Sequence, residues 1–600
     1  MSARAATAHA TARVLAAAYD AWDRDWRWAT RRAGTRFAAR DWAGGEADAA
    51  RRLALWYRWV HAGLADARRY LGACRADRDV WRLVRDGYAA EVAARDDVEV
   101  AESFFNSLAR RAVPTLGLVP ELHFVHTALH EPGRAEIAAV ARALPVTDGP
   151  EATARAVLAT WRGPTPLGAP IEQFAAEQRR GPAGPRWRDL DDDVRRVAAA
   201  LAAEADRALG GWPDAGEIVC EPFFRGHGAF LVGRLARGAA RCPLVVALRH
   251  PVEGVTADAV LCEEAEASIV FGFSWSYFHV ETPRPRALVA FLASVLPRKR
   301  TDELYTAIGY HRHAKTELFR TLRGHLARRR ARFERAEGAR GLVMEVFTLP
   351  SLEVVFKIIK DRFGAPKRTT RREVMERYHF VFVRDRVGRL ADAQEFEGLL
   401  FKRRTFPEPL LAELAELAPS VVRVSGERVQ LAHCYTERRL VPLDVYVRTM
   451  PPDAAVAAIV DYGQAIRDLA VAGIFAGDLL LKNFGVSRHG RVIFYDYDEL
   501  TTLGECRFRP LPDLGDEEDW APEPTYGVSE ADVFPEEFAR FAVPAGPLRD
   551  AFLAHHRDLL DPAWWVATQE RVVGGELVET FPYPAERRLP PAPGRFAAAG

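Results

Sequence analysis

The sequence predicts an α+β protein in two parts: a mainly helical N-terminal domain over residues 1–315 and a two-lobed domain over residues 316–600. Length is the first reason, because 600 residues exceed what one hydrophobic core usually holds. The second reason is a change of pattern along the chain. Up to about residue 210, apolar residues recur at spacings of three and four, as in amphipathic helices; from residue 336, short β-branched and aromatic runs dominate.

Helices dominate the N-terminal domain. Residues 1–40 are rich in Ala and Arg and have no acid before Asp20, a composition that resembles a transit peptide. Tyr19, Trp22 and other apolar residues nevertheless recur at helical spacing, which favours a folded amphipathic helix. The same spacing predicts helices over residues 49–70, 77–94, 189–208 and 287–296.

A small sheet is expected within this domain. Short apolar segments bounded mostly by Gly or Pro predict strands over residues 217–220, 228–232 and 243–248. The strongest strand signal of this half covers residues 268–280, and the Pro- and Gly-rich residues 162–186 are expected to form loops. The sequence of this domain contains no recognisable metal cluster, nucleophile motif or phosphate loop, so its pattern alone does not give its function.

Composition and charge argue against several classes of protein. Lys+Arg 83 against Asp+Glu 82 gives a net charge near zero, so neither nucleic acid nor an anionic membrane is expected as the main partner. An Arg-rich helix predicted over residues 311–335 lacks the interleaved aromatic residues of nucleic-acid sites. No apolar run approaches the roughly 18–20 residues of a membrane span. Six scattered cysteines argue against zinc and disulfides, so a cytoplasmic location is expected.

The first lobe of the C-terminal domain, about residues 316–436, is expected to hold a phosphate-facing loop that is followed by strands over residues 343–347 and 354–360. Glycine in such a loop lets backbone N–H groups approach phosphate oxygens. The two glycines lack the GxGxxG spacing, and an ordinary hairpin turn is the alternative interpretation. The loop consists of Ala336, Glu337, Gly338, Ala339, Arg340, Gly341 and Leu342.

Lys357 lies within the second strand after this loop, residues 354–360, among apolar neighbours. A buried ammonium group is costly unless it is paired, and a phosphate together with a helix glutamate explains its position, as in the strand lysine of kinases. Glu373 and Glu376, on a helix predicted over residues 370–378, are both candidate partners, and the sequence does not choose between them. Lys360 is expected to reach water.

The end of the first lobe is predicted from three features. Residues 378–383 have the pattern of a strand. Asp392, with a glutamate three residues later, fits a helix N-cap. A strand over residues 430–437 then leads into a connector marked by proline, the expected hinge before the second lobe, about residues 437–600.

A long helix expected over residues 454–472 precedes the most informative stretch of the chain. Asp478, Asn483 five residues later and Asp496 at the end of an apolar run are separated as in a kinase catalytic loop followed by a metal-binding aspartate. Transfer of phosphate from ATP needs a carboxylate facing the acceptor hydroxyl and oxygen ligands that hold Mg²⁺ against the phosphates. The order of lysine strand, hinge, long helix and these three residues therefore predicts a phosphotransferase with a bilobal, protein-kinase-like fold.

Two departures from the general protein-kinase pattern surround these residues. Ala476-Gly477 stand where His-Arg is usual, so control by an activation-loop phosphate is not expected. Asp496 is followed by Tyr497-Asp498 instead of Phe-Gly, which makes Asp498 a further candidate metal ligand. Lys482 is placed to supply positive charge to the γ-phosphate.

Segments 351–361, 385–396 and 478–498, together with the residues around 271–280, resemble the bacterial isocitrate dehydrogenase kinase/phosphatase family. The resemblance covers most of the chain. It implies a kinase-like catalytic domain behind an N-terminal regulatory domain that senses AMP and related metabolites. It also implies one active site that uses ATP to phosphorylate isocitrate dehydrogenase on a serine, diverting carbon from the tricarboxylic acid cycle to the glyoxylate bypass, and that removes the same phosphate.

The resemblance also implies residue roles, cofactors and partners. Asp392 is implied as an active-site acid needed for the phosphatase reaction, which replaces its interpretation as a cap. AMP and ADP are implied as effectors and isocitrate dehydrogenase as the protein partner, and the sequence is compatible with a homodimer. The other implied roles are ATP binding by residues 336–342 and Lys357, activation of the acceptor by Asp478, and Mg²⁺ binding by Asn483 and Asp496.

Two other functions stay open on sequence. The missing His-Arg and Phe-Gly elements also fit a catalytically dead kinase-like module that only binds isocitrate dehydrogenase, although every metal-binding carboxylate is retained. A small-molecule phosphotransferase would lack the same elements.

Overall fold

The computed structural model describes residues 3–125, 131–163, 187–272, 277–328, 331–364, 367, 369–511, 529 and 531–590. The chain forms two compact units: unit 1 comprises residues 1–272, 276–324 and 582–600, and unit 2 comprises 273–275 and 325–581. Residues 316–324 and the C-terminal segment thus group with unit 1, which differs from the predicted division between 315 and 316. Over the described ranges, no helix has the length and apolarity that crossing a membrane requires.

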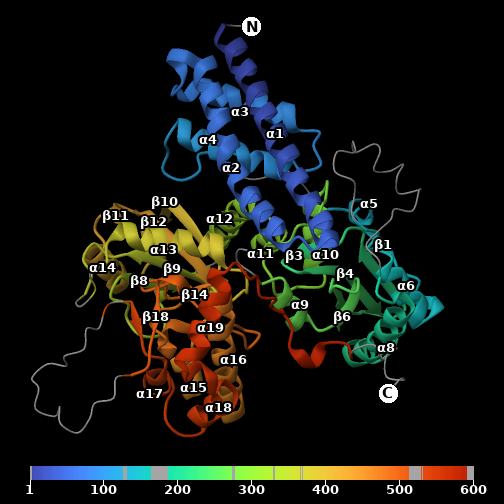
Figure 1. Ribbon diagram of the computed structural model, residues 1–600. Helices are drawn as coiled ribbons and strands as arrows, with labels where there is room; N and C mark the ends of the chain where they lie inside the picture. The colour runs from blue at the N-terminus through green and yellow to red at the C-terminus, as the bar shows by residue number, and fades with distance from the viewer. Residues whose placement is uncertain are drawn as a thin grey trace, which may run out of the picture. The chain divides into compact units, whose positions relative to one another are not determined.

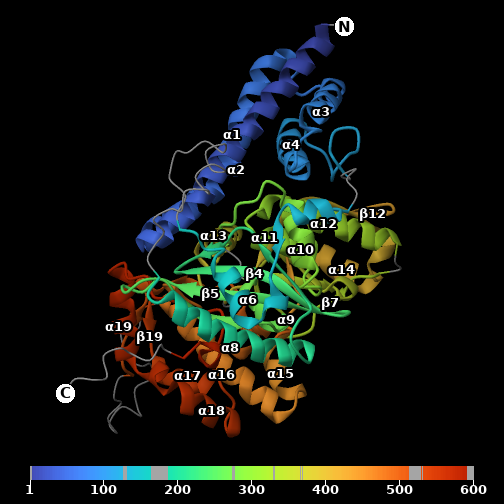
Figure 2. The ribbon, with the colours of Figure 1, turned by 90° about the vertical axis from the view of Figure 1, so that its right-hand side faces the viewer.

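Unit 1 begins with a long helical pair, α1 (Ala3–Ala39) and α2 (Trp42–Leu71), which lie side by side (Figures 1 and 2). The face of α1 predicted from its spacing is buried, with Trp22 and Trp26 at 3% and 2% exposure. The amphipathic-helix interpretation of residues 1–40 is therefore confirmed. The other helices of this unit are α3 (Arg78–Val92), α4 (Val98–Ala112), α5 (Arg134–Ala138), α6 (Pro150–Leu158), α8 (Leu190–Leu209), α9 (Glu264–Val270), α10 (Pro285–Ala293), α11 (Thr301–Ala307) and α12 (His311–Arg328), the last of which continues into unit 2.

An antiparallel sheet in the order β1-β2-β4-β5-β6, with β3 paired to β4, forms the rest of unit 1. Its strands confirm the three short strands predicted between residues 217 and 248. Leu231, Leu244 and Val246 of this sheet share a buried core with α6 and α8. The strands are β1 (Ala141–Ala143), β2 (Ala215–Val219), β3 (Phe223–Arg225), β4 (Gly228–Arg237), β5 (Ala240–Arg249) and β6 (Thr256–Leu261).

The strand predicted over residues 268–280 is wrong for the described part of that range. Helix α9 ends at Val270, and His279 makes only an isolated bridge with Phe224. The aromatic side chains are buried without a strand ladder, because Phe271 packs on Phe278 with ring centroids 4.9 Å apart. Aromatic packing therefore explains the hydrophobic pattern that resembled a strand. Residues 273–276, and residues 164–186 of the predicted loop, lie outside the described residues.

The C-terminal segment after residue 582 returns to unit 1. Arg588 forms an antiparallel bridge with Ala259 on β6, the edge strand of the sheet. The Tyr583 hydroxyl donates to Asp258 Oδ2 at 2.8 Å, and Arg587 pairs with Glu204 at 3.0 Å. We call residues 582–590 the C-terminal strap. The strap covers an edge strand that would otherwise expose unpaired backbone groups.

Unit 2 contains a second antiparallel sheet, in the order β10-β12-β9-β8-β7, with β11 paired to β12. Strands β8 and β9 confirm the two strands predicted after the glycine-containing loop, and β12 confirms the strand before the hinge. The elements of this part are β7 (Glu334–Arg335), β8 (Met344–Leu349), β9 (Val354–Ile359), α13 (Arg371–Arg384), β10 (Ala393–Lys402), α14 (Glu408–Leu417), β11 (Val422–Ser425) and β12 (Arg428–Arg438).

Two local predictions in this part are wrong. Residues 378–383 lie within α13, because a capping box at Thr370 starts the helix and Val374, Tyr378 and Val381 are buried at helical spacing. Tertiary burial therefore decides over the strand propensity of this run. Asp392 does not begin a helix, since β10 follows it and pairs with β12.

The remainder of unit 2 is largely helical, and residues 478–498, predicted to be the catalytic stretch, lie on or beside short strands. The long helix α16 (Pro452–Val471) confirms the prediction for residues 454–472. Its Tyr462 packs against Phe484, with ring centroids 4.8 Å apart. The other elements are β13 (Val441–Pro442), α15 (Leu443–Thr449), β14 (Ile474–Phe475), β15 (Phe484–Val486), β16 (Val492–Phe494), β17 (Thr501–Thr502), β18 (Arg507–Phe508), β19 (Asp532–Val533), α17 (Phe538–Phe541), α18 (Pro547–His556) and α19 (Pro562–Val573).

Candidate active site

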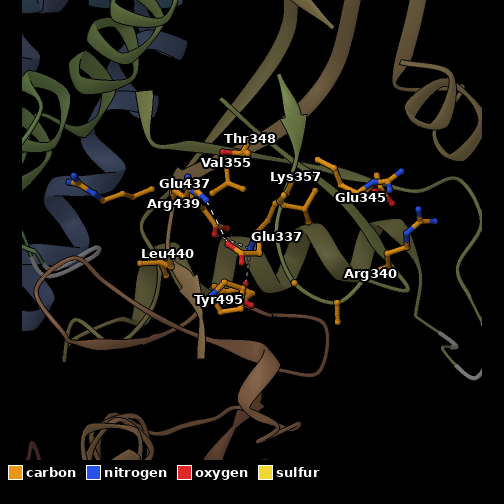
Figure 3. Close-up of a pocket in the computed structure, with 18 residues that line it drawn as sticks. Glu337, Arg340, Glu345, Thr348, Val355, Lys357, Glu437, Arg439, Leu440 and Tyr495 are labelled. Atoms are coloured by element: carbon orange, nitrogen blue, oxygen red, sulfur yellow. Dashed lines mark hydrogen bonds and ion pairs between the residues drawn. The ribbon is translucent and has the colours of Figure 1, made fainter. Parts of the chain in front are cut away.

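A pocket of about 820 Å³, counting the space open to solvent, lies between the glycine-containing loop and the hinge. Residues 336–341 of the loop line the pocket, whereas Leu342 does not. Gly338 has a φ of 109°, and a Cβ there would lie 3.0 Å from Pro442 Cγ, so glycine is required for this close approach. Figure 3 shows the residues that line the pocket.

Lys357 points into this pocket from β9 and is 6% exposed. Its Nζ lies 2.8 Å from Glu437 Oε2 on β12 and donates to the Tyr495 carbonyl, also at 2.8 Å (Figure 3). The buried lysine is therefore paired, as its position in an apolar strand required. Its partner comes from the neighbouring strand, and the sequence analysis missed it. An acid at the end of the apolar run 430–437 was the signal that could have found it.

Neither helix glutamate considered from sequence pairs with Lys357. Glu373 accepts a hydrogen bond from Thr370 N at 2.7 Å and completes the capping box of α13. Glu376 is largely exposed and lies 3.6 Å from Arg372 of the same helix. Both carboxylates therefore act within α13.

The prediction that Lys360 reaches water is wrong. Its Nζ lies 3.1 Å from Glu345 Oε2 on β8 and donates to the Gly341 carbonyl at 2.7 Å. A Cβ on Gly341 would lie 2.7 Å from the Met344 carbonyl, so this residue must be small. The buried Lys360–Glu345 pair therefore holds the end of the glycine-containing loop in place.

Asp478 and Asn483 lie together in the loop that follows β14. The Asn483 amide nitrogen donates to the Asp478 carbonyl at 3.1 Å, and Asp478 Oδ1 accepts from Leu480 N at 2.9 Å. Gly477 has a φ of 77°, and a Cβ there would lie 2.4 Å from the Glu499 carbonyl. The contact explains why glycine stands before Asp478, where arginine is usual in kinases: a side chain does not fit.

Two further carboxylates follow β16. Asp498 is 8% exposed, and its backbone N–H donates to Asp496 Oδ1 at 3.4 Å. Burial, reinforced by the nearby Asp496 carboxylate, raises the pKa of Asp498 to about 7. Arg377 donates to the Asp498 carbonyl, and Lys367 pairs with Glu499, so cations border this acidic group. A carboxyl group so close to neutral pH can act as an acid, a base or a metal ligand.

The backbone places Asp392 near both parts of the site. Ala391 N donates to the Phe494 carbonyl at 3.0 Å, and Ala393 pairs in register with Glu437. Asp392 therefore lies between the strand that carries Glu437 and the end of β16. The Lys482 side chain is exposed on the catalytic loop.

A buried arginine, Arg389, connects helix α16 to strand β16. Arg389, 2% exposed, donates from Nη1 and Nη2 to Asp461 on α16 at 2.7 and 2.8 Å. Its Nε donates to Asp468 at 2.7 Å, and Nη1 also donates to the Val492 carbonyl at 2.9 Å. This network ties α16 to β16 just before Asp496, and nothing in the sequence pattern indicated it.

The residues present fit MgATP. Backbone amides of the loop and Lys357 suit phosphate, and the amide and carboxylate oxygens of Asn483 and Asp496 are ligands that Mg²⁺ prefers. Glu437 Oε1 is buried without a hydrogen-bond partner, which is a further acceptor for a bound group. Within the described ranges, no three His, Cys, Asp or Glu side chains are already gathered closely enough to hold a metal without a ligand. A site completed by substrate phosphates is usual for Mg²⁺.

Comparisons with known proteins match both units. The model of the isocitrate dehydrogenase kinase/phosphatase (AceK) kinase domain matches residues 331–585, and the model of the regulatory domain of the same family matches residues 12–170 and 179–330. An isocitrate dehydrogenase kinase/phosphatase of Anaeromyxobacter dehalogenans (strain 2CP-C) is 46% identical over 98% of each chain. Another, of Anaeromyxobacter sp. (strain Fw109-5), is 45% identical over 97% of this chain and 98% of its own.

Proposed function

The chain belongs to the isocitrate dehydrogenase kinase/phosphatase family, and from this premise we propose that its nucleotide pocket serves both reactions of a bifunctional enzyme. In one reaction the enzyme phosphorylates a serine of isocitrate dehydrogenase with ATP. In the other it removes that phosphate, and together they control the branch between the tricarboxylic acid cycle and the glyoxylate bypass. The buried Lys357–Glu437 pair at the wall of the pocket is the observation that carries this proposal.

In the kinase direction, each residue has one role. Residues 336–341 and Lys357 bind the phosphates of ATP, and Asp478 orients or deprotonates the serine hydroxyl. Asn483 and Asp496, with Asp498 as a further ligand, would hold Mg²⁺, which would screen the phosphate charge. The exposed Lys482 supplies positive charge to the transferred group. The serine oxygen forms a bond to the γ-phosphorus as the bond to ADP breaks, and the serine proton passes to Asp478.

In the phosphatase direction, water attacks the phosphoserine phosphorus, the serine hydroxyl leaves with a proton, and inorganic phosphate is released. This hydrolysis needs a carboxyl group to activate water and an acid to protonate the leaving oxygen. Asp392, next to the strand that carries Glu437, is assigned to this reaction. The raised pKa of Asp498 supports a second carboxyl group that exchanges protons near neutral pH.

Regulation and location complete the proposal. Unit 1 is assigned the regulatory role and senses AMP and ADP. The enzyme works in the cytoplasm on a protein substrate, without nucleic acid or membrane as a partner.

Purified protein tests this function directly. Labelled phosphate should pass from γ-labelled ATP to isocitrate dehydrogenase in the presence of Mg²⁺, and ADP or AMP should then promote its release. Asp392→Asn should reduce release more than transfer, while Asp550→Asn, at an exposed position of α18, should change neither. Failure of the wild type in both reactions would overturn the proposal. Equal losses in Asp392→Asn would remove the separate role of Asp392.

A further inference from the structure

The partner of the ATP-binding lysine lies in an unusual place. In protein kinases a glutamate of the helix that packs on the sheet pairs with the strand lysine, and movement of that helix makes or breaks the pair. Here Lys357 on β9 lies opposite Tyr435 on β12, and Glu437 lies opposite Val355. Residues two apart on a strand share a face, so Lys357 and Glu437 project from the same face of one sheet. The ion pair is therefore built between adjacent strands.

The helix on this face, α13, contributes an aromatic contact. Tyr378 stacks on Tyr435 with ring centroids 3.8 Å apart and an interplanar angle of 11°. The two acids of α13 that were considered as partners make other contacts. Glu373 completes the capping box, and Glu376 lies on the exposed surface beside Arg372. The side chain of α13 that stacks on Tyr435 is thus an uncharged tyrosine, whose hydroxyl also acts on the Glu437 carboxylate.

The environment of Glu437 also indicates a functional position. The residue is 4% exposed; one carboxylate oxygen binds Lys357, while the other, Oε1, is buried without a hydrogen-bond partner. Leaving such a buried acceptor without a hydrogen bond destabilises the free protein. Because Glu437 lines the nucleotide pocket, a hydroxyl or a bound water of the nucleotide complex can supply the missing donor.

We propose that Glu437 is the positioning residue for Lys357 and replaces the helix glutamate of other kinases. The inference rests on the proposed function in that Lys357 binds ATP phosphates. Since both partners lie on hydrogen-bonded neighbouring strands, the pair forms without any movement of α13. The ATP site is therefore assembled by the sheet, and control of the enzyme acts elsewhere than on this ion pair.

A double-mutant cycle tests the proposal. Glu437→Gln should lower kcat/KM for ATP by about 10²-fold, because the phosphate-binding ammonium group loses its fixed position. In the background of Lys357→Met the same substitution should add little, since Glu437 acts through Lys357. Additive losses would show an independent role for Glu437 and overturn the proposal, as would native kinetics in a folded Glu437→Gln variant.

The helix acids provide a matched control that does not depend on a buried substitution. Glu373→Gln/Glu376→Gln keeps an amide able to complete the capping box and should retain the wild-type kcat and KM for ATP. A loss comparable to that of Glu437→Gln would identify the helix as the source of the partner and overturn the proposal.

Calorimetry with MgADP measures nucleotide binding by the pocket without an acceptor protein. If isocitrate dehydrogenase is not a substrate, weaker MgADP binding by Glu437→Gln alone still supports the inference.

Discussion

Two buried cations of unit 2 are held in different ways: Lys357 lines the pocket beside the glycine-containing loop, and Arg389 lies between α16 and β16. Arg389 is saturated: it donates to two carboxylates and one carbonyl, and its planar group ties α16 to β16. Lys357 is bound by one carboxylate and one carbonyl, and the other oxygen of that carboxylate is buried without a hydrogen-bond partner. Both arrangements offset the cost of burying a charge. The difference indicates that Arg389 stabilises the fold, whereas the Lys357 pair leaves hydrogen-bonding capacity for a ligand.

The pKa values of their carboxylate partners are shifted in opposite directions. The Arg389 guanidinium, with help from the Val492 N–H, outweighs burial and lowers the pKa of Asp461. At Glu437, burial outweighs the neighbouring Lys357 ammonium and raises the pKa. Burial and Asp496 raise the pKa of Asp498 further into the neutral range. A surplus of carboxylates therefore distinguishes the pocket from the structural ion pairs behind it.

The largest expected effect on stability comes from Arg389. Arg389→Met leaves the half-buried carboxylates of Asp461 and Asp468 without their counter-charge and should destabilise unit 2 by up to about 3–5 kcal/mol. Denaturant unfolding of the full chain measures the change. A loss below about 1 kcal/mol, typical of surface ion pairs, would contradict the structural role assigned to Arg389.

Asp478→Asn should separate chemistry from stability. The substitution preserves shape but removes the carboxylate that faces the acceptor, so kcat for phosphorylation should fall by about 10²–10⁴-fold. The melting temperature should stay near that of the wild type, unlike that of Arg389→Met. Phosphorylation at the wild-type rate would show that another residue activates the serine.

Acid should affect the pocket before it affects the fold. Asp498, with a pKa of about 7, gains a proton as the pH falls from 8 to 6, so binding of MgATP should weaken in that window. Asp461 has a lowered pKa in the folded state; its contribution to stability is present above the unfolded value of about 3.9 and is lost only as the pH falls through the folded pKa. Parallel titrations by calorimetry and circular dichroism should show this order, and simultaneous loss of binding and structure would contradict it.

The smallest effect is expected at a partly exposed charge. Arg587 on the C-terminal strap pairs with Glu204, Glu263 and Glu266 while 22% of its side chain is exposed. Arg587→Gln should cost no more than about 1 kcal/mol, and added salt should reduce the difference from the wild type. A cost as large as that of Arg389→Met would remove the distinction between buried and exposed charges.

Sequence predicted the kinase-like part of the molecule well because its chemistry lies in local segments. Each signal lies within one short segment of the chain. Lys357 stands within an apolar strand, Asp478 and Asn483 belong to one loop, and Asp496 follows a short strand. The long helices were predicted for the same reason, since periodicity is a local signal.

What the sequence missed depends on contacts between distant segments. Glu437 is 80 residues from Lys357 and pairs with it only because β12 lies beside β9. Arg389 pairs with Asp461 and Asp468 of α16, and Lys360 at the end of β9 pairs with Glu345 on the neighbouring strand β8. The strand prediction for residues 268–280 failed for the same reason, because tertiary packing and not strand pairing buries Phe271 and Phe278.

The central claim, that one nucleotide pocket serves both reactions, is tested most directly with Lys357→Met. Transfer of labelled phosphate to isocitrate dehydrogenase and release of phosphate from the phosphorylated protein should be measured on the same preparation, with its fold checked by circular dichroism. The account predicts that both rates fall together by at least about 10²-fold, because the same lysine positions the nucleotide phosphates. A folded variant that loses transfer but releases phosphate at the wild-type rate would contradict it and place the phosphatase reaction at another site.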